Sequence, residues 1–105
     1  MDNSYKEKVT GTGAAITIKP GFEPSYIKVI NIEGLCTLEF VPDAMSAGYG
    51  YKVLTGIDST TDTVSLHSYI TTGGITISED KVSFTIGTDT DINVNGEDLV
   101  VIAIR

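Results

Sequence analysis

Residues 73–105 read GGITISEDKVSFTIGTDTDINVNGEDLVVIAIR and contain the clearest strand patterns of the chain. Apolar and polar residues alternate over 75–78 and again over 82–86, on either side of the polar turn SEDK, and this pattern predicts a β-hairpin. Residues 99–104, LVVIAI, are almost wholly apolar, which is typical of a central strand covered on both faces by sheet or by a partner subunit. We expect the hydrophobic core to form around this last strand.

Short runs with strand patterns also occur in the rest of the chain, separated by glycine, proline and other turn residues. These runs lie at 14–19, 25–32, 35–41, 51–55 and 63–70. Residues 42–50, PDAMSAGYG, lack strand character and are expected to form a surface loop. About eight short strands at fairly regular spacing predict an all-β fold, a single-domain antiparallel β-sandwich or barrel that is jelly-roll-like. We assign residues 14–105 to this β-sandwich domain.

The composition is that of one globular domain with an acidic surface. The chain has 105 residues, which is enough for one domain and too short for two. Its net charge of −7 repels phosphate backbones and anionic lipids, so we expect no nucleic-acid partner and no membrane partner. The single cysteine, Cys36, cannot form a disulfide within the chain. The polar N-terminus and the lack of a long apolar run predict a protein made in a cytoplasm and used without secretion.

Residues 1–13 differ from the rest because they are polar and then rich in glycine and threonine. Tyr5 and Val9 are their apolar anchors. Such a segment lacks the apolar area to order itself alone, so it forms either a loose tail or an extended N-terminal arm on a neighbour. We expect the arm.

Residues 91–96, DINVNG, match the opening of an EF-hand calcium loop. The closing position of that loop requires a bidentate acid, and here it falls on Ile102. The pattern therefore favours a short strand over 91–94 followed by an Asn-Gly turn, with no metal site. A looser calcium site built from Asp89, Asp91 or Asp98 is the alternative.

The residues that usually carry catalysis are sparse. His67 is the only histidine, and its neighbours Ser65 and Ser68 lie beside it on a predicted strand, which does not make a triad. Cys36 is expected to be a small core residue. We therefore expect no enzyme, no catalytic residues and no cofactor. Tyr49 and Tyr51 flank a loop and provide the basis for an alternative, a sugar-binding platform.

Two parts of the chain resemble one known group of proteins. Residues 21–31, GFEPSYIKVIN, resemble an opening pattern of small virion proteins of tailed bacteriophages. Four later segments resemble the C-terminal pattern of the same group: GITI (74–77), FTIG (84–87), DINVNGE (91–97) and IA (102–103). Together the blocks cover nearly the whole chain.

The resemblance implies a head decoration, or cement, protein with a β-sandwich or barrel core. It implies a non-enzymatic homotrimer that binds the major capsid protein on the outer surface of the phage head, after synthesis in the cytoplasm of the bacterial host. On this interpretation residues 1–13 reach over a neighbour or the capsid, and one apolar sheet face forms the oligomer contact. The alternative is a carbohydrate- or receptor-binding module of a phage fibre or baseplate.

Overall fold

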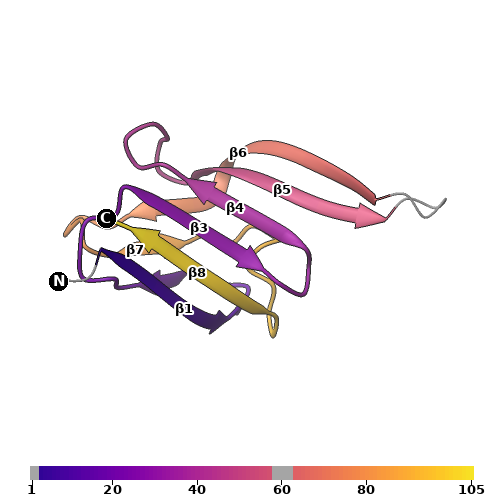
Figure 1. The fold of residues 1–105 in the computed structure, drawn as a ribbon, viewed down its shortest axis with the longest axis horizontal. Coiled ribbons are helices and arrows are strands. Elements are labelled where there is room, and N and C mark those ends of the chain that lie inside the picture. The colour runs from indigo at the N-terminus through magenta and orange to yellow at the C-terminus, as the bar shows by residue number, and fades with distance from the viewer. Residues whose placement is uncertain (1–2, 58–62) are drawn as a thin grey trace.

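The fold is a single antiparallel sheet of eight strands that curls into a half-barrel (Figure 1). A computed structural model of the chain describes residues 3–57 and 63–105, and these residues contain no helix. The strands are β1 (Ser4–Thr10), β2 (Ile16–Ile18), β3 (Tyr26–Asn31), β4 (Cys36–Phe40), β5 (Tyr49–Ile57), β6 (Thr63–Ile77), β7 (Phe84–Ile86) and β8 (Asp98–Ile104). The all-β, single-domain prediction is confirmed, and the sheet is of the curled, barrel-like kind.

The strand order is β1-β8-β3-β4-β5-β6-β7-β2. Strands β1 and β2 follow one another in sequence and form the two edges of the sheet. The sheet therefore curls so that one short connection, residues 11–15, passes from one edge to the other. Gly11 closes this connection against the loop before β8, because its amide donates to the Glu97 carbonyl (2.8 Å) and its carbonyl accepts from the Gly96 amide (2.9 Å).

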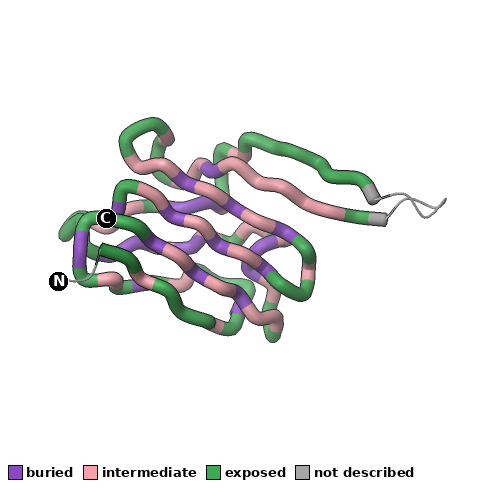
Figure 2. Tube along the Cα trace, in the orientation of Figure 1, coloured by how far each residue is buried: buried purple, intermediate pink, exposed green. Residues whose placement is uncertain are grey.

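The core fills the inner face of the curl. Strands β3, β4 and β8 alternate buried and half-buried residues along their length, as Figure 2 shows. The largest fully buried apolar side chains are those of Phe40, Phe84, Ile27, Leu38, Ile75, Ile86, Ile92, Leu99, Val29 and Val101. Strand β8 lies between β1 and β3, as expected of a central strand, but within this chain only its inner face is fully covered. Its outer face, which carries Val100, Ile102 and Ile104, is left partly exposed.

The predicted hairpin over 75–86 is confirmed, since β6 and β7 pair with Ile77 opposite Phe84. The predicted strand over 91–94 is wrong. The Asp89 carboxylate accepts hydrogen bonds from the Asp91 and Ile92 amides, at 3.1 and 3.2 Å, and so draws the backbone into a turn. Aspartate side chains compete with strand ladders in this way. The Asn-Gly turn that follows is present, with Gly96 at a φ of 87°.

Strand β6 is one long bent strand where the sequence predicts a strand ending at residue 70. Its first half pairs with β5 and its second half with β7, and the register jumps between Gly50, opposite Ile70, and Tyr49, opposite Ile75. The bend requires glycine: a Cβ on Gly74 would overlap the Tyr49 carbonyl oxygen, and Gly73 has a φ of 77°. The pattern Gly-Gly therefore marks a change of direction inside a strand.

The β5–β6 hairpin projects from the body and gives the molecule its long axis, with extents of 48 × 26 × 24 Å (Figure 1). The pairing of β4 with β5 ends at Cys36 opposite Leu54, while β5 and β6 continue to pair as far as Ile57 opposite Thr63. The outer part of the hairpin is therefore a two-stranded ribbon.

Candidate functional site

Residues 1–13, expected to form an arm, contain the edge strand β1 in this chain. Ser4–Thr10 pairs along its whole length with β8, and only Tyr5 and Val9 pack partly against the core. Among the strands that the structure describes, none pairs with the other side of β1. Ser4–Thr10 is thus an edge strand of its own domain, and an arm that lies on a neighbour stays a prediction.

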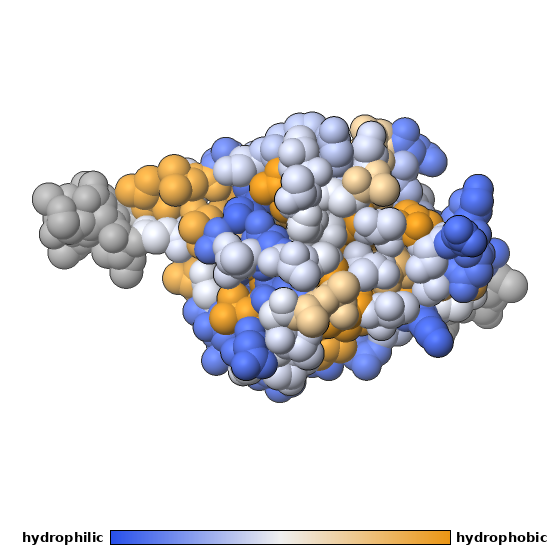
Figure 3. All heavy atoms as spheres, turned by 180° about the vertical axis from the view of Figure 1, so that it is seen from behind, coloured by the Kyte–Doolittle hydropathy of each residue, from blue (hydrophilic) through white to orange (hydrophobic). Residues whose placement is uncertain are grey.

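The projecting hairpin displays apolar side chains, which Figure 3 shows gathered over its outer part. Leu66 lies opposite Leu54, and Leu54 lies opposite the buried Cys36, so these side chains continue the inner face of the sheet beyond the core. Leu66 is 61% exposed and Val64 is 42% exposed. We call Leu54, Val64 and Leu66 the hairpin surface.

A second apolar surface lies on the outer face, at the turn between β3 and β4. Ile32 is 49% exposed and Leu35 is 56% exposed. Beside them is a shallow pocket of about 340 Å³ lined by Ile30, Asn31, Ile32, Leu35, Cys36, Thr37 and Thr55. We call Ile30, Ile32 and Leu35 the turn surface. The turn IEGL has isoleucine and leucine at its two ends, where polar residues and glycine are usual, and this is the sequence signal for the turn surface.

The turn surface is held in place by Asn31, which is fully buried. Its side-chain oxygen accepts hydrogen bonds from the Glu33 and Gly34 amides at 3.0 and 2.8 Å. Its amide nitrogen donates to the Ile92 carbonyl at 3.1 Å, which ties the turn to the loop before β8. The apolar side chains are thus presented on a rigid support.

The outer face of β1, β8 and β3 is basic and apolar. Lys6 and Lys28 both lie opposite Ile102, one on each side, and Lys8 lies opposite Val100. Three of the seven basic residues of an acidic chain thus share one face. We call Lys6, Lys8 and Lys28 with the apolar residues between them the basic face. Lys8 lies 3.6 Å from Asp98 on the same face, so Lys6 and Lys28 are the lysines whose charge suits an acidic partner.

Aromatic residues gather on the outer face of β5 and β6. Tyr51 lies opposite Tyr69, and Tyr69 meets Tyr49 edge to face with ring centroids 5.4 Å apart. The Tyr51 hydroxyl hydrogen-bonds the Nδ1 atom of His67. The structure therefore brings together both tyrosines and the histidine that the sequence singled out, on the outer side of the curl.

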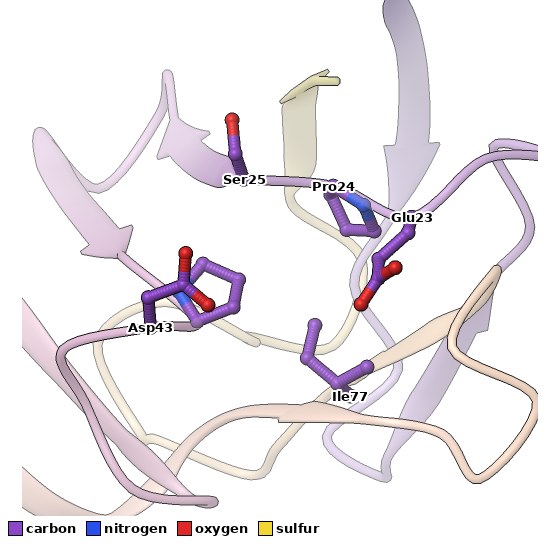
Figure 4. A pocket seen from close by; sticks show the side chains of 6 residues that line it. Glu23, Pro24, Ser25, Asp43 and Ile77 are labelled. Atoms are coloured by element: carbon purple, nitrogen blue, oxygen red, sulfur yellow. The ribbon is translucent and has the colours of Figure 1, made fainter.

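A small pocket of about 300 Å³ lies where the β2–β3 connection meets the β4–β5 loop (Figure 4). Glu23 and Asp43 lie on different walls of it, with Ile77 beneath them. Both acids belong to exposed loops. Two carboxylates beside an open pocket can attract a cationic side chain.

The proposed calcium ligands are divided between two places. Asp89 and Asp91 both accept hydrogen bonds from Lys52 Nζ, at 3.0 and 2.7 Å, whereas Asp98 lies 3.6 Å from Lys8. Burial alone would lower the pKa of Lys52, but its hydrogen bonds to Asp91 and Asp89 raise that pKa above its usual value. The ammonium group thus neutralises the two carboxylates. In the described parts of the chain no three histidine, cysteine or acidic side chains form a group that could hold a metal ion.

Cys36 lies in the core, as its sequence context indicates. It is fully buried, and burial raises the pKa of its thiol to about 11. A thiol in this state is protonated at neutral pH and is a poor nucleophile.

No helix among the described residues is long and apolar enough to cross a membrane. Comparisons of the chain with protein-family models, with curated proteins and with solved structures find no match.

Proposed function

We propose that the protein is a non-enzymatic structural protein of a tailed-phage virion, which binds the outside of the capsid as an oligomer and stabilises the head. The observation that carries the proposal is the placement of exposed apolar side chains. They lie on a projecting hairpin and on a turn, where packing within the chain leaves them uncovered. Apolar surfaces of this kind mark sites of contact with other proteins. The resemblance of residues 21–31 and 74–103 to phage virion proteins is the reason for proposing a phage virion as the place where the protein acts.

The mechanism is stabilisation by binding. A protein that binds the intact shell and not its ruptured state stabilises the shell by mass action. An oligomer that contacts several capsomers at once gains further affinity from effective concentration. The basic face of β1, β8 and β3 is the part of an otherwise acidic molecule that can approach an acidic shell without repulsion. In this proposal the segment expected to form an N-terminal arm acts as the edge strand β1, which lies beside that face.

The test is the reassembly of capsids stripped of this protein. Wild-type protein should cosediment with the capsids and raise the temperature at which they rupture. The double variant Lys6→Glu, Lys28→Glu should bind more weakly and with a smaller dependence on salt, because rim charges act chiefly on association. Lys19→Glu changes an exposed lysine outside the basic face and is the matched control. Failure of the wild-type protein to bind the major capsid protein or any head particle would reject the proposal.

A second candidate function, glycan or receptor binding, is favoured by the aromatic group of Tyr49, Tyr51 and Tyr69. Exposed tyrosine rings can stack against sugar faces. A glycan array is the direct test, with Tyr69→Ala as the variant because this ring is the most exposed of the three. Binding that this variant abolishes would support the second candidate over the first.

A further inference from the structure

Two apolar surfaces of this chain cannot cover one another. The hairpin surface continues the inner face of the sheet, since Leu66, Leu54 and Cys36 share one row across β6, β5 and β4. The turn surface lies on the outer face, where Ile30 is opposite Thr37 and Val100. Side chains on opposite faces of one sheet point away from each other. A partner that covers both surfaces therefore has to come from outside the chain.

The conformation of Leu35 adds to the case for a contact at the turn. Its φ is 54°, in the left-handed region where glycine and asparagine are favoured and a branched side chain is strained. The chain nevertheless has glycine one position earlier and leucine here. More than half of this side chain is exposed, so burial within the monomer does not compensate the strain. A conformational cost retained at an exposed position is a reason to test Leu35 for a role in binding.

The charge pattern indicates that the partner is a second copy of this chain. With a net charge of −7, most surfaces of two copies repel one another. Strands β5 and β6 add no negative charge to such a contact, because neither the nine residues of β5 nor the fifteen of β6 include an aspartate or a glutamate. The acids of this region, Asp58 and Asp62, lie between the two strands, outside the described residues. The turn surface, by contrast, borders Glu33 and Asp98. The described strands of the hairpin bring no carboxylate of their own to that acidic border.

We propose that the hairpin surface of one copy docks against the turn surface of the next copy, with Leu66 and Val64 entering the pocket beside Ile32 and Leu35. The contact joins two different surfaces, so it is heterologous, and repeated contacts of this kind form a ring if the rotation between copies closes and an open filament if it does not. This assignment deepens the proposed function and rests on it only in requiring an oligomer.

The test uses two variants that each remove one side of the contact. Leu66→Thr alters the hairpin surface at an exposed strand position, and Leu35→Gly alters the turn surface while relieving the left-handed φ. The control is Val82→Ser, which removes an exposed apolar side chain from the β6–β7 turn. Sedimentation velocity should show an oligomer for the wild-type and control proteins. Each variant alone should associate more weakly by about tenfold or more, which corresponds to the loss of one interface anchor.

Mixing the two variants gives the decisive result. The Leu35→Gly protein keeps an intact hairpin and the Leu66→Thr protein keeps an intact turn, so one good contact can form between them. The mixture should therefore contain pairs of chains and nothing larger. Full oligomers from either variant alone, a mixture that stays monomeric, or a wild-type protein that is monomeric at all concentrations would overturn the inference. Variants that remain oligomeric but no longer bind stripped capsids would also overturn it, since these surfaces would then face the capsid.

The capsid experiment separates this inference from the proposed function. A ring that forms by the expected contact but binds no capsid keeps the inference and rejects the function. A protein that binds capsids as a monomer rejects the inference and keeps only the capsid-binding part of the proposed function.

Discussion

The loop over residues 88–97 and the outer half of the β5–β6 hairpin reverse the usual relation between regular structure and burial. The loop has no strand ladder, yet Ile92 is fully buried and Asn93 is only 2% exposed. The hairpin has an unbroken ladder, yet Leu66 is mostly exposed. Regular backbone pairing alone therefore does not identify the rigid part of this molecule.

Side-chain hydrogen bonds account for the difference. Asn93 accepts from the Thr12 and Gly13 amides at 2.9 and 3.2 Å and donates to the Ala14 carbonyl at 2.6 Å, so it joins the loop to the β1–β2 connection. Lys52 joins the same loop to β5 through Asp89. The outer hairpin is a two-stranded ribbon, and isolated ribbons are marginally stable in water. We therefore expect the loop to open only with the whole domain and the hairpin to open locally.

The largest expected effect comes from making the same substitution, glycine to alanine, at the two ends of the hairpin. Gly74→Ala places a Cβ against the Tyr49 carbonyl oxygen at the bend where the hairpin joins the body, so it should destabilise the protein by about 4 kcal/mol or prevent folding. Gly56→Ala, in the outer hairpin, has open space around it and should stabilise the fold by about 0.5 kcal/mol. Urea denaturation measures both values. Equal effects at the two positions would contradict the division of the hairpin into a packed end and a free end.

A smaller effect should come from the loop. Asn93→Ala leaves backbone groups at Thr12, Gly13, Ala14 and Gly87 without their partner, which should cost about 3 kcal/mol of unfolding free energy. Asn95→Ala, two residues further along in an exposed turn, should change the stability by less than about 0.5 kcal/mol. Hydrogen exchange of the Gly11 and Gly96 amides should accelerate in the first variant only. Retained protection there would show that the loop is held by something other than Asn93.

The next largest effect is a loss of unfolding free energy at alkaline pH. Burial raises the pKa of Cys36 to about 11, with Lys52 opposing and Asp89 and Asp91 adding to the rise, whereas the unfolded thiol titrates near 9.0. The folded state therefore binds this proton more tightly, so its contribution is complete below pH 9 and falls as the pH approaches 11. The loss should be on the order of 2 kcal/mol.

Denaturation at pH 8, 9 and 10 measures this loss before other groups take part. Burial, with the hydrogen bond to Glu39 adding to it, raises the pKa of Tyr26 from 10.0 to about 12, so this tyrosine affects stability only above pH 10. The Lys52 ammonium, whose pKa is raised from 10.5, contributes stability that is likewise lost above that range. Cys36→Ala should therefore flatten the profile between pH 9 and 10. A slope unchanged by this variant would place the thiol in contact with solvent.

The sequence patterns predicted the backbone of the body well where strands pair with near neighbours. Alternation over 75–86 gave the β6–β7 hairpin, and the apolar run over 99–104 gave the central β8. The alternation pattern gave a wrong prediction at 91–94. Isoleucine and valine alternate there as in a strand, but the Asp89 carboxylate binds the following amides and forms a turn. The pattern also failed at Gly73 and Gly74, which read as a strand end and proved to be a bend.

The sequence patterns could not predict the long-range contacts that form the candidate surfaces. Lys52 and Asp89 are 37 residues apart, and Asn31 and Ile92 are 61 apart, so only the folded chain brings them together. Alternation places Leu66 on one face of its strand and His67 on the other, and the structure shows that the face of Leu66 is the inner one, in the row of Leu54 and Cys36. Alternation could not show that Leu66 lies beyond the core. That depends on the length of the neighbouring strand β4, whose pairing with β5 ends at Cys36 opposite Leu54.

The smallest expected effect is the loss of Leu66 from the isolated chain. Leu66→Thr keeps a residue of high strand propensity at a position that is already solvated, so the unfolding free energy of the monomer should change by less than about 0.5 kcal/mol. Urea denaturation at a concentration below that of association measures it. A larger loss would mean that the hairpin surface is packed within the chain after all. A change near zero, together with the loss of the oligomer, would show that this side chain contributes to a contact between copies and hardly at all to folding.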